Sequence, residues 1–450
     1  MGPCKFHFSQ MLLPDGWARD VGIETDDAGM ITAVLPGAAG AGESLPGVAV
    51  PGLANVHSHA HQRAMAGLAE RSGPGADSFW TWREAMYGFA LKMRPEELQA
   101  VAAQLYVECL KAGFTSVGEF QYLHHQPDGT PYANRAELSL RCLEAAREAG
   151  ISMTMLPVLY AYGGFGGQAP NAGQRRFLNN QQGFQAIIAE IASSLRGHER
   201  MGIAPHSLRA VTVVLLREVM TEAGPVHIHI AEQIKEVEDC LAFNGMRPVE
   251  YLSSEFDLNA RWSLIHATHM NARETSGLAA SGAHAALCPV TEANLGDGIF
   301  NGVDYMSAGG AIAIGTDSHV SVGAAEELRV LEYSQRYLTR ARTVLSGGAA
   351  RSTGRNLFEA ALAGGARSIA QPASGIRVGQ RLDAVVLDDE HPALIGRKGD
   401  GILDSWIFSG GSACVRDVIV GGKIVVRDGH HAREAEIKTK FAAAMKRLQE

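Results

Sequence analysis

The chain has 450 residues, of which 46% are hydrophobic and 20% charged, the balance of a globular protein with a large core. Its formal net charge of −8 disfavours nucleic acid and anionic membranes as general partners, and no apolar run is long enough for a transmembrane helix. Six scattered cysteines without a Cys-x-x-Cys pair, and an N-terminus unlike a signal peptide, lead us to expect a cytoplasmic location.

The first 48 residues are expected to form short β-strands separated by Gly, Asp and Pro turns. One example is Gly22-Ile-Glu-Thr, which precedes the turn sequence Asp26-Asp-Ala-Gly. An apolar run then leads from Gly47 to His57. We expect this run to contain the first strand of a larger unit.

From His57 to about residue 340, apolar strands alternate with amphipathic helices. The further strands are expected at 114–119, 152–159, 200–204, 226–230, 263–266, 285–288 and 311–316. The helices are expected at 95–111, 134–149, 181–195, 208–222, 237–253, 273–280 and 324–340. Eight strand–helix units predict an α/β protein with a (β/α)8 TIM-like barrel over residues 49–374. The alternative is an open doubly wound sheet, although the sequence has no glycine-rich loop typical of nucleotide binding.

Two other segments complete the predicted organisation. The glycine-rich stretch 161–173 is either a lid over the site or a plain surface loop. Residues 375–430 return to strand-like runs split by glycines, such as Asp383-Ala-Val-Val-Leu. We therefore expect a small β-sandwich domain built from both chain ends, residues 1–48 and 375–450.

Titratable side chains follow four of the predicted barrel strands. The first strand ends in His57-Ser-His59, whose two imidazoles can reach one ion because residues i and i+2 of a strand share a side. The other three clusters are His227-Ile-His229-Ile-Ala-Glu232, His266-Ala-Thr-His269 and Thr316-Asp317-Ser-His319. All four lie at carboxyl ends of strands, the face on which such barrels build active sites.

Three imidazoles and one carboxylate would leave an open position for water on a bound metal, as in a hydrolase. The predicted ligands are His57, His59, His229 and Asp317, with His227 either orienting the site or packing in the core. Glu232 follows His229 by three residues and can move protons without binding the ion. A second metal ion would need a bridging carboxylate, commonly a carbamylated Lys at the end of the fourth strand. That region has no Lys, so we expect one divalent metal ion per subunit. Zinc suits these ligands best, although iron or manganese would also bind.

The order His-x-His, His-x-x-Glu, His and Asp resembles the amidohydrolase superfamily, in its mononuclear deaminase branch. Three stretches further resemble the N-formimidoyl-L-glutamate deiminases of histidine degradation. They are His57-Ser-His-Ala-His-Gln62-Arg, Phe79-Trp-Thr-Trp-Arg83 and Ala204-Pro-His206-Ser-Leu-Arg209. This resemblance implies a homodimer and a set of substrate contacts, Gln62, Arg83, Tyr122, His206 and Arg209.

The chemistry of the substrate agrees with the resemblance. Formimidoylglutamate is a small-molecule dicarboxylate, and in a chain of charge −8 it needs local guanidinium groups such as Arg83 and Arg209. The expected reaction is metal-dependent hydrolysis to N-formylglutamate and ammonia, with Glu232, His266 and Asp317 as the catalytic residues. The alternatives are a deaminase of a purine, pyrimidine or related heterocycle, and more remotely a non-catalytic barrel scaffold.

Overall fold

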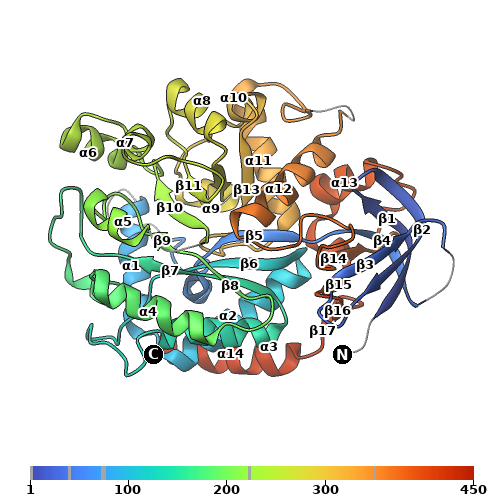
Figure 1. Ribbon diagram of the computed structural model, residues 1–450, viewed down its shortest axis with the longest axis horizontal. Coiled ribbons are helices and arrows are strands. Elements are labelled where there is room, and N and C mark those ends of the chain that lie inside the picture. Colours follow the sequence, from blue (N-terminus) through green and yellow to red (C-terminus); the bar gives the residue numbers. More distant parts are fainter. Residues whose placement is uncertain (1–3, 39–41, 72–77, 221–223, 348–350) are drawn as a thin grey trace.

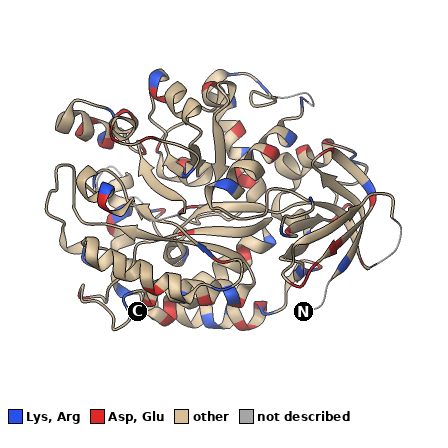
Figure 2. Ribbon diagram, viewed as in Figure 1, with Lys and Arg blue, Asp and Glu red and all other residues tan. Residues whose placement is uncertain are grey.

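The computed structural model describes residues 4–38, 42–71, 78–220, 224–347 and 351–450. A β-sheet formed by the two chain ends lies at one side of the molecule, and a larger α/β region forms the rest (Figure 1). Figure 2 shows that charged residues lie mostly on the peripheral helices, whereas the central strands carry few of them. Among the described residues, no helix is both long and apolar enough to cross a membrane.

The terminal sheet has eight strands in the order β17-β16-β15-β14-β4-β1-β2-β3. β4 joins the two chain ends, since it pairs parallel with β1 and antiparallel with β14. Both chain ends therefore contribute to one β-structure, as predicted, and this structure is a single eight-stranded sheet. Because β4 runs on to Pro51, past residue 48, the exact division into domains stays a prediction. The strands are β1 (Lys5–Leu13), β2 (Gly16–Thr25), β3 (Ile31–Leu35), β4 (Glu43–Pro51), β14 (Ala384–Leu387), β15 (Val415–Val420), β16 (Lys423–Arg427) and β17 (His430–His431).

The α/β region contains two parallel sheets that meet at both edges. A bridge between Ser58 and Asp317 joins them on one side, and bridges from Ile203 to Val226 and from Ser207 to His229 join them on the other. This arrangement is that of a TIM-like barrel, as predicted. One sheet holds β5 (Leu53–Ser58), β6 (Phe114–Gln121), β7 (Ser152–Leu159), β8 (Arg200–Met201) and β9 (Ala204–Pro205). The other holds β10 (Val226–Ile230), β11 (Trp262–His266), β12 (His284–Leu287) and β13 (Ala311–Ile314).

The barrel strands are short and almost wholly buried, which explains why they appear in the sequence as apolar runs without alternation. The fourth strand, predicted as one segment, is divided into β8 and β9. Gly202 lies between them, where a Cβ atom would come within 2.3 Å of the Pro225 carbonyl oxygen. The close approach to β10 therefore interrupts the regular ladder.

Helices cover the outside of the barrel (Figure 1). α2 keeps its predicted bounds, but the segment predicted as one helix over 237–253 forms α6 and α7. Gly245 ends α6 in a left-handed conformation (φ 76°), and Pro248 begins α7. The helices are α1 (Phe79–Lys92), α2 (Pro95–Lys111), α3 (Glu137–Ala149), α4 (Gln181–Ser194), α5 (Val213–Val219), α6 (Ile234–Asn244), α7 (Pro248–Glu255), α8 (Ala272–Ser281), α9 (Pro289–Leu295), α10 (Gly302–Ser307), α11 (Ala324–Thr339), α12 (Thr353–Ser368), α13 (Gly401–Ser405) and α14 (Glu434–Gln449).

α5 and α14 also differ from expectation, in extent or in place. α5 begins only after Thr212, whose side chain accepts a hydrogen bond from the Leu215 N–H, and the end of the predicted helix 208–222 falls partly outside the described residues. α14 leaves the terminal sheet and packs on α2, where Arg447 pairs with Glu97 and Lys111 with Glu434. The last helix of the chain thus braces the barrel wall.

Candidate active site

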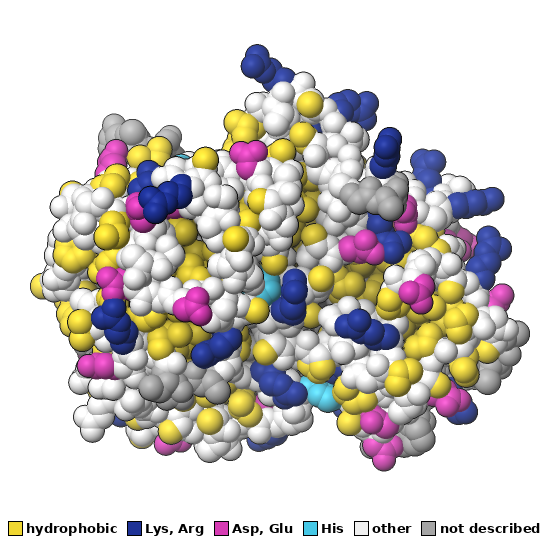
Figure 3. Space-filling model, turned by 45° about the horizontal axis from the view of Figure 1, so that its top comes forward, with side chains coloured by type: hydrophobic (Ala, Val, Ile, Leu, Met, Phe, Trp, Pro, Cys, Tyr) yellow, Lys and Arg dark blue, Asp and Glu magenta, His cyan; other side chains and the backbone are white. Residues whose placement is uncertain are grey.

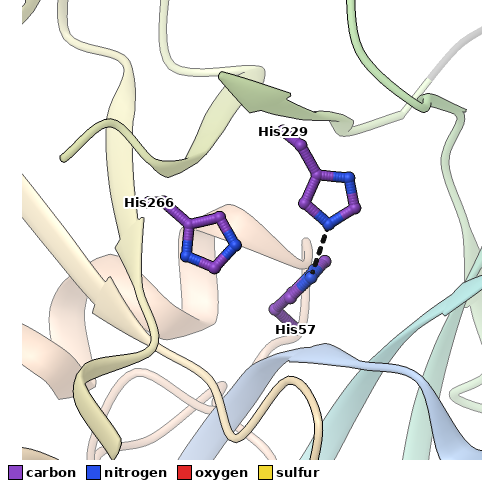
Figure 4. Close-up of side chains that lie close together, drawn as sticks. All are labelled: His57, His229 and His266. Atoms are coloured by element: carbon purple, nitrogen blue, oxygen red, sulfur yellow. Dashed lines mark hydrogen bonds between the residues drawn. The ribbon is translucent and has the colours of Figure 1, made fainter. Parts of the chain in front are cut away.

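The four predicted metal ligands meet at the carboxyl end of the barrel. His57 is the last but one residue of β5 and His59 follows that strand, His229 lies on β10, and Asp317 follows β13. The Nε2 atoms of His57 and His229 are 3.0 Å apart (Figure 4), and one Asp317 oxygen lies 3.5 Å from His57 Nε2 and 3.3 Å from His59 Nε2. The residues that the sequence spreads over 260 positions therefore converge on one point.

Hydrogen bonds orient two of these imidazoles toward that point. His59 Nδ1 donates to the Phe120 carbonyl oxygen at 2.9 Å, and His229 Nδ1 donates to the His206 carbonyl oxygen at 3.0 Å. Each bond leaves the Nε2 lone pair free to coordinate. Burial lowers the pKa of His57, His59 and His229, which favours the neutral imidazole that a metal ligand requires.

The donor set fits a divalent metal ion. Candidate ligand atoms of His57, His59 and Asp317 all lie within 4.8 Å of one another, as do those of His57, His229 and His266. His227, the alternative ligand considered from the sequence, is directed elsewhere, since its Nε2 donates to the Ser368 carbonyl oxygen at 2.8 Å. Three imidazoles and a carboxylate at this spacing are typical of a catalytic zinc site.

The backbone around the site adopts conformations that non-glycine residues rarely occupy. Positive φ angles occur at Ala231, His266, Ala267, Asp317 and His319, with values from 47° to 67°. Such residues cost of order 1–3 kcal/mol each and persist where surrounding contacts hold them. The turns after β10, β11 and β13 are thus bent to direct their side chains into the centre.

Glu232 and His266 lie beside the ligand cluster. His266 Nε2 is 3.7 Å from Glu232 and 3.8 Å from the second oxygen of Asp317. Burial raises the pKa of Glu232 to about 7, although His266 and Arg209 oppose the shift. Burial disfavours the imidazolium of His266, but the carboxylates of Glu232, Glu292 and Asp317 outweigh it and raise the His266 pKa. Glu232 can therefore gain or lose a proton near neutral pH, beside a His266 ring that stays protonated there.

Glu292, which belongs to no motif in the sequence, holds His266. Its Oε1 accepts from His266 Nδ1 at 3.2 Å and from the Cys288 N–H at 2.8 Å. The first bond leaves His266 Nε2 directed at Glu232 and Asp317. Glu292 lies in the short helix α9, in a stretch with no pattern that would have marked it.

All five predicted substrate contacts line one pocket above this cluster, which encloses about 580 Å³ including its open mouth. Gln62 Nε2 donates to the Tyr122 hydroxyl at 2.8 Å. The guanidinium of Arg83 lies 4.6 Å from the centre of the Trp80 ring. The predicted contacts are Gln62, Arg83, Tyr122, His206 and Arg209.

Arg209 provides a buried cation at this pocket. Its side chain is 13% exposed, and its Nε lies 3.9 Å from Glu236, which is fully buried. Burial disfavours the charge, but Glu236 and Glu232 overcome this and raise the Arg209 pKa. The Nε atoms of both Arg83 and Arg209 are buried and make no hydrogen bond. Such donors are suited to an anionic ligand.

The apolar part of the pocket was not predicted. α1 supplies much of it, and this helix was missed although its Phe79-Trp-Thr-Trp-Arg83 stretch had been singled out. The unpredicted lining residues are Phe79, Trp82, Met86, Tyr87, Tyr160, Phe177 and Leu295. The glycine-rich loop borders an adjoining outer cavity, which shares Arg83 and Arg209 with the pocket and includes Gly163, Phe165 and Phe243. Its role as a lid stays a prediction.

Figure 3 shows a histidine near the centre of the face that comes forward when the top of the molecule is tilted toward the viewer.

Known proteins of similar sequence and fold indicate the family of this chain. The model of the amidohydrolase family matches residues 48–425. The formimidoylglutamate deiminase of Pseudomonas aeruginosa is 48% identical over 97% of this chain and 98% of its own. The crystal structure of an amidohydrolase from Brucella melitensis is 51% identical with a TM-score of 0.95, covering 99% of this chain and 100% of that one. An adenosine deaminase from Xanthomonas campestris with bound zinc shares the fold at 20% identity and a TM-score of 0.80, over 99% and 98% of the two chains.

These matches confirm both resemblances that the motifs indicated, and with them the prediction of a hydrolase acting on C–N bonds. The chain belongs to the amidohydrolase family.

Proposed function

We propose that the protein hydrolyses N-formimidoyl-L-glutamate to N-formyl-L-glutamate and ammonia in histidine degradation. The observation that carries the proposal is one pocket in which two arginines lie beside a His/Asp cluster, a glutamate and a histidine. The relative that is 48% identical is itself named a formimidoylglutamate deiminase. A pocket for a dicarboxylate with a hydrolysable C=N group requires this combination of groups.

His57, His59, His229 and Asp317 would hold one divalent metal ion per subunit, zinc being the best match to their nitrogen and oxygen donors. The ion would polarise water and bring its pKa toward neutrality. The carboxylate of Asp317 accepts the proton of the attacking water, with His266 3.8 Å away. His266 stabilises the charge that develops as the carbon becomes tetrahedral.

Glu232 serves as the proton donor. With a pKa raised to about 7, it carries a proton in a large fraction of molecules at neutral pH. It protonates the imino nitrogen, takes up the hydroxyl proton of the tetrahedral adduct as the new C=O bond forms, and delivers that proton to the departing ammonia. The proton that Asp317 received from water then restores the acid form of Glu232. Its position in the turn above His229, within 3.7 Å of His266, supports this role.

The remaining pocket residues orient the substrate. Arg83 and Arg209 bind the carboxylates, and Gln62, Tyr122 and His206 contact the rest of the molecule. Burial lowers the pKa of His206, so that its ring offers a neutral hydrogen-bonding group. Holding the formimidoyl carbon over the water converts a bimolecular encounter into an oriented one, which contributes several kcal/mol.

A substrate screen must exclude a heterocycle deaminase, because a relative that is 26% identical is named a 5-methylthioadenosine/S-adenosylhomocysteine deaminase. Purified protein is assayed for ammonia release from formimidoylglutamate, guanine, cytosine and S-adenosylhomocysteine, before and after chelation. We expect release from formimidoylglutamate alone and its loss in the chelated protein. Release from a heterocycle at a higher kcat/KM would replace the proposed substrate, and activity that survives chelation together with Glu232→Gln would exclude the mechanism.

Arg209→Met tests the dicarboxylate contact directly. A hydrogen bond to a charged group contributes about 1.5–3 kcal/mol, so its loss is expected to lower kcat/KM by about 10- to 200-fold. Arg217→Met is the matched control, since Arg217 lies on the neighbouring helix α5, is 55% exposed and pairs with Glu255. An unchanged kcat/KM in Arg209→Met would remove this residue from the substrate site.

We also propose a cytoplasmic homodimer, as the family resemblance implies. Sedimentation of the purified protein would give its mass directly, and a monomer at micromolar concentration would contradict the proposed assembly.

A further inference from the structure

His319 is buried beneath the metal ligands but is not one of them. The N–H of His59 donates to its Nε2 at 3.2 Å, and the Ser58 hydroxyl oxygen lies 3.1 Å from the same atom. An N–H group can only donate, so Nε2 is an acceptor and the ring proton resides on Nδ1. Nδ1 lies 2.7 Å from the Thr316 hydroxyl oxygen and donates to it. One imidazole thus connects the end of β5 with the turn after β13.

Ser58 separates the two imidazole ligands of β5 in sequence, and its side chain points to the other side of the strand. There its hydroxyl lies between Glu119 Oε2, 2.5 Å away, and His319 Nε2, and its single proton can be donated to either acceptor. The carboxylate of Glu119 also accepts from the Ala60 N–H at 2.7 Å and from the Tyr106 hydroxyl at 3.0 Å. The segment that carries His57 and His59 is therefore tied to β6 and α2.

Thr316 is held from the opposite side by Asn55. The Thr316 N–H donates to the Asn55 side-chain oxygen at 3.0 Å, and the Asn55 amide donates back to the Thr316 hydroxyl at 2.7 Å. These contacts complete a buried assembly that we call the β5–β13 network. Its members are Asn55, Ser58, Tyr106, Glu119, Thr316 and His319.

The network supports a junction at which the main chain is under strain. β5 meets the turn after β13 through a single parallel bridge, in which Asp317 N–H donates to the His57 carbonyl at 3.0 Å and His59 N–H to the Asp317 carbonyl at 3.2 Å. Asp317 and His319 both have left-handed φ angles, 47° and 57°. Two imidazole ligands lie on one side of this junction and the carboxylate ligand on the other. Side-chain bonds across the junction oppose its relaxation.

We propose that His319 is a positioning residue for the metal site, which holds the His57/His59 pair and Asp317 at their mutual spacing through Ser58, His59 and Thr316. The inference rests on the proposed ligands but not on the proposed substrate. It predicts that metal affinity depends on a side chain that does not touch the metal.

The test is the metal dissociation constant of His319→Asn, measured on metal-free protein by competition with a chromophoric chelator for Zn²⁺. Asparagine can keep the contact with Thr316 within the turn but cannot reach β5. Loss of a residue that orients metal ligands typically lowers affinity 10- to 100-fold, and we expect a change in that range. The same competition with Co²⁺ reports the ligand geometry through the visible spectrum, which should change.

His227→Asn is the matched control, because His227 is equally buried on a barrel strand and donates to the Ser368 carbonyl rather than to the ligand segments. It should lower the unfolding midpoint of the metal-free protein and leave the metal affinity within about twofold. An equal loss of affinity in both variants would reduce His319 to a general core residue and overturn the proposal. So would wild-type affinity and an unchanged cobalt spectrum in His319→Asn.

Ser58→Ala probes the same junction from β5 and serves in place of His319→Asn should that variant not fold. It should weaken metal binding. The double variant Ser58→Ala/His319→Asn should lose less affinity than the sum of the two single losses, because both substitutions remove the same Ser58–His319 contact. Strict additivity, or an unaffected Ser58→Ala, would contradict a shared link. Since affinity is measured without substrate, an inactive protein with wild-type metal binding would refute the proposed reaction and leave this inference intact.

Discussion

Glu292 offers a sharp test of how His266 works. Its carboxylate accepts from His266 Nδ1 at 3.2 Å and from the Cys288 N–H at 2.8 Å. In Glu292→Gln the side-chain oxygen can still accept from both donors, but the negative charge that favours a protonated His266 is lost. A hydrogen bond between charged groups exceeds a neutral one by about 1–1.5 kcal/mol, which corresponds to a tenfold lower kcat.

Glu292→Ala removes the acceptor altogether. It leaves two buried donors without a partner, at about 1–3 kcal/mol each, so the expected loss in kcat rises to about 100-fold. Both effects should appear in kcat and kcat/KM alike with KM nearly constant, because His266 is proposed to act on the transition state.

The assay is steady-state ammonia release from metal-loaded protein of measured metal content. Glu327→Gln is the control, since Glu327 is also buried, and it accepts from the Val290 N–H of the same helix α9. A kcat within twofold of wild type in Glu292→Ala, or an equal loss in Glu327→Gln, would show that His266 does not depend on Glu292 in the reaction.

Two further predictions concern pH and stability. Glu232 must be protonated to donate, and burial raises its pKa to about 7. We therefore expect kcat/KM to fall about tenfold for each pH unit above that value. A flat profile from pH 7 to 9 would exclude Glu232 as the acid. Arg381 is fully buried and pairs with Asp383 through Nε at 2.9 Å, and Arg381→Met leaves that carboxylate without its cation. The expected cost is about 3–5 kcal/mol in urea unfolding, and a loss below 1 kcal/mol would show that the pair contributes little.

The parts of the site that could be predicted are those whose placement follows from strand order alone. His57, His59, His229 and Asp317 lie at or soon after the carboxyl end of a barrel strand, and the carboxyl ends of parallel strands must meet at one edge. The distance between these residues in the sequence does not matter, because the barrel places the ends of its strands, and with them the four side chains, close together. The eight strands were recognisable for the same reason, as short apolar runs buried on both faces.

What escaped prediction depends on contacts between distant segments. Glu292 orients His266 only because α9 returns beside β11, and His319 meets Ser58 because β13 closes on β5. Helix periodicity also extended the helix predicted over 237–253 across Gly245, where the left-handed turn ends α6. α1 was missed although its aromatic stretch had been noted. Aromatic side chains of α1 line the pocket, a role that depends on the folded barrel and not on the local pattern.

The place of β4 in the terminal sheet has a consequence for how the chain is made. β1 to β4 can pair as soon as they leave the ribosome, but one edge of β4 has no partner until β14, residues 384–387, has been synthesised. An unpaired strand edge is a template for pairing with other chains. During synthesis of the whole barrel the nascent protein therefore carries an exposed edge, and its yield should depend on chaperones that shield this edge.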